Sequence, residues 1–257
     1  LALCDLARVP SDIFDNISVS ELYTYMVNYS SAAGSFNLYE SLDEMLYMME
    51  IKRGLNMDAF NWTSMHHLTS LQRLYIFSSN LVRIGPQFST MPSNLTHLMI
   101  QGGDLEVIED GAFSGLQLRD VEVSYTKLTT LSRKIFPPGA DNLRVLSFRN
   151  NKLRHLPDDM FTNMPNLNLL DLSANELVAL SDNVLKPVLQ NMRLVDISRN
   201  RFHCGCEVLW MISFFQSTAA GGRFRHSDEV TCSSPPELLN TKVASLTAAG
   251  LRCSTKD

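Results

Sequence analysis

One spacing of apolar residues recurs three times between residues 143 and 202, in copies that start at Leu143, Leu167 and Met192. Each copy has apolar residues at its positions 1, 4, 6 and 11 and an asparagine at position 9. On a short strand, positions 4 and 6 point inward while positions 3, 5 and 7 point outward. Because one copy cannot bury its own apolar face, the copies must stack on a shared core. The spacing predicts an α/β solenoid, mostly strand and loop, with a curved parallel sheet on its concave face.

The asparagine at position 9 stands where the chain turns sharply away from the strand. Its amide can hydrogen-bond buried backbone groups of the turn, each of which would otherwise cost about 1–3 kcal/mol. The three regular copies carry Asn151, Asn175 and Asn200 at this position. The five copies before them carry small or hydroxyl residues, in order Ser30, Gly54, Ser79, Gly103 and Thr126. We therefore expect the N-terminal half to be less regular.

Further copies extend the pattern towards the N-terminus. Complete copies start at Leu22, Leu46, Leu71, Leu95, Leu118, Leu143, Leu167 and Met192, at intervals of 23–25 residues. We expect a partial repeat or the end of an N-terminal cap over residues 1–21, repeats over 22–199 and a C-terminal cap over 200–257. The chain begins in mid-repeat, so the natural start of the repeat is expected before Leu1, as is any leader peptide. Cys4 falls at position 9, where it is either a buried thiol in place of the asparagine or the last cysteine of an N-terminal disulfide cap.

The cysteines and sequons point to a compartment. Four of the five cysteines lie close together after the last copy, at Cys204, Cys206, Cys232 and Cys253. Four Asn-x-Ser/Thr sequons also occur, and we expect N-glycans at Asn16, Asn28, Asn61 and Asn94. Together these features favour the secretory pathway, where disulfides persist. Asn28 is expected at position 7 of the first copy, so a glycan there would cover part of the concave face.

Several classes of function find no support in the sequence. The net charge of −5 and the lack of a dense Lys/Arg run argue against a nucleic-acid partner. The apolar run over residues 209–215 is too short to span a bilayer. No Gly-x-Ser-x-Gly elbow, His-Glu-x-x-His helix or phosphate-binding glycine loop occurs, and the adjacent His66 and His67 point in divergent directions. We expect no enzymatic activity, no catalytic or metal-binding residues and no cofactor.

The residues after the last copy carry a second pattern. Asn200-x-Phe202-x-Cys204-x-Cys206 is followed by Leu209-Trp210, by Cys232 with Pro235-Pro236-x-Leu238, and by Cys253. This order resembles the cysteine-rich C-terminal cap of extracellular leucine-rich-repeat proteins, whose spacing the copies share. One departure is Arg201, where that family usually has proline. The resemblance implies the disulfides Cys204–Cys232 and Cys206–Cys253, in a leucine-rich-repeat solenoid that is a receptor or adhesion ectodomain or a secreted relative.

The outward positions of the predicted sheet carry large side chains on neighbouring strands. Tyr75, Phe77 and Met99 form an exposed cluster, with cations on one flank (Lys52, Arg53 and Arg73) and acids on the other (Asp120, Glu122, Asp171 and Asp196). A clustered apolar patch with a charged rim is typical of binding sites. The residues we expect to bind a partner are Lys52, Arg73, Tyr75, Phe77, Met99, Gln101, Glu122 and Tyr125.

The sequence thus favours a non-catalytic extracellular recognition domain, secreted or at the cell surface, that binds a protein ligand or co-receptor on its concave face. One alternative is a non-catalytic subunit that carries or stabilises a secreted enzyme, as the resemblance allows. Another is a structural matrix protein, for which a symmetric homodimer through the concave face would be expected. Neither nucleic acid nor a small-molecule cofactor is expected as a partner.

Overall fold

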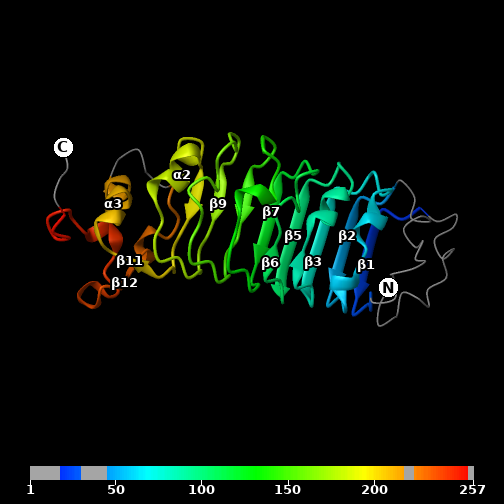
Figure 1. The fold of residues 1–257 in the computed structure, drawn as a ribbon, viewed down its shortest axis with the longest axis horizontal. Coiled ribbons are helices and arrows are strands. Elements are labelled where there is room, and N and C mark those ends of the chain that lie inside the picture. The colour runs from blue at the N-terminus through cyan, green and yellow to red at the C-terminus, as the bar shows by residue number, and fades with distance from the viewer. Residues whose placement is uncertain (1–17, 30–44, 217–222, 254–257) are drawn as a thin grey trace.

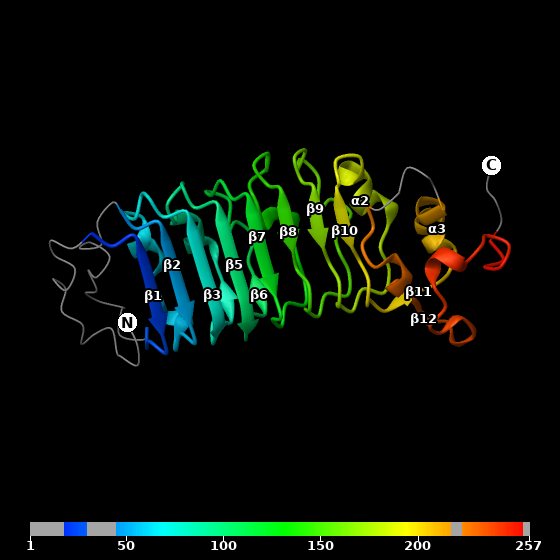
Figure 2. The ribbon, with the colours of Figure 1, turned by 180° about the vertical axis from the view of Figure 1, so that it is seen from behind.

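The computed structural model describes residues 18–29, 45–216 and 223–253, and its strands stand side by side along the length of the molecule (Figures 1 and 2). Eight strands form one parallel sheet in which they follow one another in chain order. They are β1 (Glu21–Tyr25), β2 (Met48–Lys52), β3 (Arg73–Ser79), β5 (His97–Gly103), β7 (Asp120–Ser124), β8 (Val145–Ser147), β9 (Leu169–Asp171) and β10 (Leu194–Asp196). The predicted parallel sheet is confirmed.

The other elements are short. β4 (Arg83–Ile84) pairs with β6 (Val107–Ile108), and β11 (Phe202–His203) pairs with β12 (Cys232–Ser234). The α-helices of the described chain, α2 (Asp182–Leu189) and α3 (Leu209–Gln216), both lie towards its C-terminal end (Figure 1). Single turns of 3₁₀-helix fill many connections: Met57–Ala59, Trp62–Met65, Pro86–Thr90, Arg133–Ile135, Cys206–Val208, Ser227–Glu229, Pro236–Leu238 and Val243–Ser245. Strand and loop therefore make up most of the fold.

The core follows from the alternation of side chains along each strand. In β3, Leu74 and Ile76 are fully buried, whereas Arg73, Tyr75 and Phe77, which alternate with them, reach solvent. Behind the strands a row of rings crosses the repeats with centroid separations of 4.5–5.7 Å, through Phe60, Trp62, Phe88, Phe113 and Phe136. Each such ring pair adds about 0.5–1.5 kcal/mol beyond the area it buries. Neighbouring repeats are thereby joined on both sides of the core.

The asparagines at position 9 join neighbouring turns. Nδ2 of Asn175 donates to the backbone oxygens of Phe148 (2.8 Å) and Leu172 (3.0 Å), and Oδ1 accepts from the backbone N–H of Leu153 (3.1 Å). The asparagines of the two adjacent repeats, Asn151 and Asn200, make the same contacts. Each amide therefore satisfies buried groups of its own repeat and of the preceding one, as the position predicts.

The first repeat starts three residues earlier than the sequence pattern predicts. Leu22 pairs with Met49 and Thr24 pairs with Ile51, so Leu22 and Thr24 occupy positions 4 and 6. The repeat therefore starts at Val19, and the predicted start at Leu22 is wrong. The pattern misleads because the inward residue at position 6 is a polar threonine.

A hydrogen bond explains why that threonine can be buried. Thr24 is 4% exposed, and its hydroxyl lies 2.9 Å from the hydroxyl of the fully buried Tyr29. A buried hydroxyl with a partner avoids most of the desolvation cost that it would otherwise carry. Tyr25, which the sequence pattern assigns to the core, instead points outward and is 39% exposed.

The corrected register also moves Asn28. The residue at position 9 becomes Val27, in place of Ser30, which lies outside the described residues. Asn28 then follows the turn, where it bridges to Leu55 and its Oδ1 accepts a hydrogen bond from Nδ2 of Asn56 (2.8 Å). The prediction that Asn28 points into the concave face is therefore wrong. Asn16 and Cys4 lie outside the described residues.

One residue of every repeat, at position 8, has left-handed backbone conformation. Its φ lies between 48° and 71° at Met26, Arg53, Ser78, Gly102, Tyr125, Asn150, Ala174 and Arg199. This conformation bends the chain at the C-terminal end of the strand or just beyond it, and it leads into the turn that carries position 9. Because Met26 shares it, the turn supports the corrected register of the first repeat.

The C-terminal cap closes the last repeat. Disulfides join Cys204 to Cys232 and Cys206 to Cys253, the two pairings that the resemblance implies. The cap also pairs with the edge of the sheet, because the N–H of Val195 donates to Arg223 O (2.8 Å) and the N–H of Arg225 donates to Val195 O (2.9 Å). Backbone groups of β10 that would otherwise form an open edge are thereby paired.

Candidate partner-binding face

The outward side chains of the eight-stranded sheet form one surface, which we call the sheet face. The strand register arranges them in rows that cross the strands. From β1 to β7, one row holds Tyr23, Glu50, Tyr75, Met99 and Glu122, and another holds Tyr25, Lys52, Phe77, Gln101 and Ser124. Paired residues lie on strands about 4.8 Å apart, so neighbours in a row can contact one another.

The centre of this face is apolar. The ring centroids of Tyr75 and Phe77 lie 6.4 Å apart, and Met99 pairs with Tyr75 on the adjacent strand. Gln101 pairs with Phe77 in the same way. All four side chains are half-buried, so their outer parts remain accessible. The structure therefore brings together the four central residues that the sequence pattern places side by side.

Two tyrosines of β1 extend the aromatic surface beyond the predicted residues. Tyr23 is 50% exposed and Tyr25 is 39% exposed. The hydroxyl of Tyr23 donates to Glu21 (2.7 Å), and this hydrogen bond to a carboxylate raises the pKa of the tyrosine above its usual value. The sequence pattern missed both rings because they face outward only in the corrected register. The alternation of Leu22, Tyr23, Thr24 and Tyr25 was the signal that could have found them.

The cations of the sheet face stack on its rings. Nζ of Lys52 lies 5.5 Å from the ring centroid of Phe77 and 2.7 Å from Glu50. The guanidinium of Arg73 lies 4.9 Å from the ring of Tyr47. Arg53 lies 5.8 Å from the ring of Tyr25, whose hydroxyl accepts a hydrogen bond from its Nη1 (3.2 Å). Contacts of this kind contribute about 0.5–1 kcal/mol at exposed sites and hold the cations beside the rings.

The predicted acidic flank is only partly available. Glu122 accepts a hydrogen bond from Ser124 (2.7 Å) and stays half-buried beside Met99. Asp171 accepts from the N–H and hydroxyl of Ser173, an internal contact that the sequence pattern does not reveal. Asp196 is 4% exposed and lies 2.8 Å from His226 of the cap. Asp196 is therefore not part of an open acidic flank.

Tyr125 lies apart from the central cluster. It follows β7 in the left-handed turn, is 47% exposed, and its ring lies 5.0 Å from the guanidinium of Arg149 on the C-terminal side. The structure therefore places it at the margin of the sheet face and does not bring it against Tyr75 or Phe77.

The sequons Asn61 and Asn94 lie away from this face. Asn61 is exposed at the start of a 3₁₀ turn, where its Oδ1 accepts from the backbone N–H (3.2 Å) and the hydroxyl (2.6 Å) of Thr63. Asn94 is exposed in the loop before β5 and donates to the backbone oxygen of Thr69 (2.6 Å). Glycans at these two positions would leave the strands uncovered.

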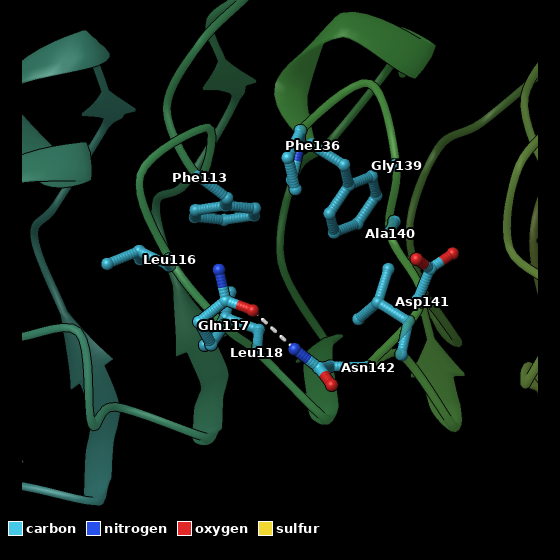
Figure 3. A pocket seen from close by; sticks show the side chains of 11 residues that line it. Phe113, Leu116, Gln117, Leu118, Phe136, Gly139, Ala140, Asp141 and Asn142 are labelled. Atoms are coloured by element: carbon cyan, nitrogen blue, oxygen red, sulfur yellow. Dashed lines mark hydrogen bonds between the residues drawn. The ribbon is translucent and has the colours of Figure 1, made fainter.

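One small crevice lies behind the strands, between two neighbouring repeats. Figure 3 shows a crevice between the rings of Phe113 and Phe136, closed below by a hydrogen bond from Asn142 to Gln117. Its volume is about 10 Å³, which accommodates at most a water molecule. No cluster of metal-binding side chains occurs within residues 18–29, 45–216 and 223–253. No helix in this described part has the length and apolar character needed to cross a bilayer.

Comparison with known proteins agrees with this architecture. The family model of leucine-rich repeats matches residues 141–202, the segment that holds the regular repeats. Residues 141–202 are leucine-rich repeats. The C-terminal cap carries the two disulfides described above, and the same stacked repeats continue through the less regular N-terminal half.

Curated relatives of this chain include several with receptor or glycoprotein names. Trophoblast glycoprotein of Macaca fascicularis is 24% identical over 70% of the chain. Toll-like receptor 2 type-2 of Gallus gallus is 27% identical over 74% of the chain. Transforming growth factor beta activator LRRC33 of Danio rerio is 27% identical over 66% of the chain. The aligned regions cover 61%, 23% and 23% of these relatives, so the chain spans less than two thirds of each.

Proposed function

We propose that this chain is a non-catalytic, extracellular recognition domain that binds a protein partner through the sheet face of β1–β7, with repeats up to residue 199 and a cap over residues 200–257. The observation that carries the proposal is the cluster of Tyr75, Phe77 and Met99 on the adjacent strands β3 and β5. Tyr23 and Tyr25 add exposed rings on β1, beyond the outward side chains Glu50 and Lys52 of β2. Contiguous exposed apolar side chains are uncommon on monomeric proteins unless they bind something.

The energetics suit a protein partner. A buried aromatic anchor at the centre of an interface carries roughly 2 kcal/mol or more, whereas charges at the rim mainly set orientation and association rate. Tyr75 and Phe77 sit on a strand paired on both sides, so little backbone freedom is lost when a partner covers them. Their position at the centre of the apolar patch makes them the expected anchors.

The unpaired cations indicate the chemistry of the partner. Among the described residues, Arg53 and Arg73 contact tyrosines and form no ion pair. The carboxylates of Glu21, Glu50 and Glu122 already accept internal contacts. The face therefore suits a protein surface with an apolar centre and carboxylates directed at Arg53 and Arg73.

The cap and the sequons support an extracellular location. Two disulfides close the C-terminal end, and such bonds persist mainly in oxidising compartments. The sequons Asn61 and Asn94 are exposed and clear of the sheet face, so N-glycosylation is compatible with binding there. Relatives named as receptors, such as the Toll-like receptor, favour the same reading.

The test uses the secreted, disulfide-bonded protein as bait against an array of purified extracellular protein domains. The double variant Tyr75→Ala/Phe77→Ala should weaken each specific interaction at least about tenfold, since two central rings are lost. Leu239→Ala is the matched control, because Leu239 is 56% exposed in the cap, away from the strands. If the double variant binds every partner as tightly as the unaltered protein, the sheet face is not the recognition surface.

A further inference from the structure

A second surface lies beyond the left-handed turns, where the chain leaves the sheet. There, residues at the same place in four consecutive repeats each donate a backbone N–H to the preceding repeat: Lys127 to Leu105 (2.8 Å), Lys152 to Leu128 (2.8 Å), Glu176 to Leu153 (2.9 Å) and Arg201 to Leu177 (3.0 Å). The repeated bonding fixes these four side chains in one row. Their backbone spacing is that of paired strands, about 4.8 Å.

The charges of this row are biased towards cations. Glu176 lies 3.1 Å from Nε of Arg154 and 3.3 Å from Nη2 of Arg201, so two guanidinium groups offset one carboxylate. Lys127 pairs with Asp104 at 2.8 Å. Lys152 is exposed and has no carboxylate within ion-pairing distance among the described residues. With Glu106, whose charge also acts on Lys127, four cations and three carboxylates occupy the row and its edge, and the cations around Lys152 outnumber the one carboxylate there.

A groove opens beside Lys152. Its volume is about 560 Å³, and it is lined by Thr129, Thr130, Lys152, Arg154, His155 and Glu176. Ligand sites typically have volumes of roughly 300–1,000 Å³. The hydroxyls of Thr129 and Thr130 are exposed and have no hydrogen-bond partner in the described part of the chain. The groove thus combines uncommitted hydrogen-bond donors with an excess of positive charge.

We propose that this groove binds a sulfated polysaccharide. The row carries cations on three of its four repeats, at Lys127, Lys152 and Arg201, and cations at intervals match a linear polymer that carries anions along its length. Clustered Lys/Arg patches are a known basis for heparin binding. The threonine hydroxyls supply hydrogen bonds that sulfate and sugar oxygens can accept. An open groove lets a long chain run past both ends, which an enclosed pocket would not. The proposal rests on the extracellular location proposed above, where such polymers occur.

The net charge of the whole chain does not oppose this binding strongly. The chain carries −5 overall, but charges more than about 8 Å apart are largely screened at physiological salt. The local excess of cations around Lys152 therefore dominates the field that a sulfate group meets. Because the groove lies beyond the strands, a polysaccharide there leaves Tyr75 and Phe77 free.

The experiment compares retention of the intact, disulfide-bonded protein on three resins at physiological salt: immobilised heparin, desulfated heparin and a sulfonated cation exchanger. We expect retention on heparin alone. Lys152→Glu should weaken binding to a soluble heparin oligosaccharide at least about tenfold, because it reverses the charge at the centre of the groove. Lys186→Glu on α2 is the matched control, since it changes the net charge equally at a distant exposed site, and it should bind as the unaltered protein does.

Three results would overturn the proposal: no retention on heparin, equal retention on the sulfonated exchanger, or equal losses in the two lysine variants. Circular dichroism of both variants checks that each is folded. The double variant Tyr75→Ala/Phe77→Ala should bind heparin normally. Failure of this proposal is therefore distinguishable from failure of the proposed sheet-face recognition.

Discussion

Replacing Asn175 with alanine removes one of the three position-9 asparagines that join neighbouring repeats, and it leaves the surface of the protein unchanged. The side chain is 5% exposed, and its amide makes three contacts with buried backbone groups, those of Phe148, Leu172 and Leu153. Alanine fits the same backbone but can donate and accept none of these hydrogen bonds. The variant therefore isolates the contribution of one amide to the coupling between adjacent repeats.

The three contacts do not contribute equally. The oxygens of Phe148 and Leu172 each keep a second amide donor, from Asn151 (3.0 Å) and Asn200 (3.0 Å), so each lost bond costs about 0.5–1.5 kcal/mol. The N–H of Leu153 has no other acceptor among the described residues, and leaving it buried and unpaired costs about 1–3 kcal/mol. Together these terms lower the free energy of unfolding by about 2–6 kcal/mol.

Urea denaturation followed by far-ultraviolet circular dichroism measures this loss. Asn166→Ala is the matched control, because exposed Asn166 makes a single bond to the backbone oxygen of Asp141 (2.8 Å) and should cost about 0.5 kcal/mol or less. A broken coupling should also let the two ends of the solenoid unfold separately, which lowers the apparent m-value. Equal urea midpoints for the two variants would refute the position-9 asparagines as the link between repeats.

Three further predictions concern the register, the cap and the glycans. Leu74→Ala should lower the free energy of unfolding by about 2–5 kcal/mol and Phe77→Ala by about 1 kcal/mol or less; equal losses in thermal denaturation would contradict the strand register. Arg199 lowers the pKa of Glu229 through a hydrogen bond, so the stability gained from this pair is complete above the ordinary carboxyl pKa of 4.5 and is lost as pH falls through the lowered value. The stability difference between the unaltered protein and Arg199→Gln should accordingly vanish in acid, and a difference that persists there would argue against the pair. Asn61→Gln should remove one glycosidase-sensitive mass increment from the secreted protein, and an unchanged glycan mass would show that Asn61 is unoccupied.

The sequence predicts the regular repeats well because each of their inward positions is visibly apolar. Leu146 and Leu170 follow the spacing and lie in the core, and the asparagines beside them form the expected contacts. The apolar spacing does not identify the first repeat, because its inward residue Thr24 is polar and is buried with a hydrogen bond to Tyr29. A single inward threonine was enough to shift the predicted start by three residues.

The residues of the candidate site can be predicted from the sequence where the strand register is predicted correctly. Tyr75, Phe77 and Met99 were found because β3 and β5 obey the pattern. Tyr23 was missed together with its strand register. The acidic flank was overestimated for a different reason, since His226 reaches Asp196 from 30 residues further along the chain. Only the folded cap shows that this carboxylate is covered.

The left-handed residue at position 8 of each repeat sets up a trade-off between stability and recognition. This conformation costs roughly 1–2 kcal/mol for most side chains, whereas glycine and asparagine adopt it readily. The chain nevertheless places Arg53 and Tyr125 there, at the border of the sheet face. Engineering for heat resistance would convert such positions to glycine or asparagine, and with each conversion a side chain that could touch a partner would disappear. The most easily stabilised version of this domain is therefore also the one with the fewest side chains available to contact a partner.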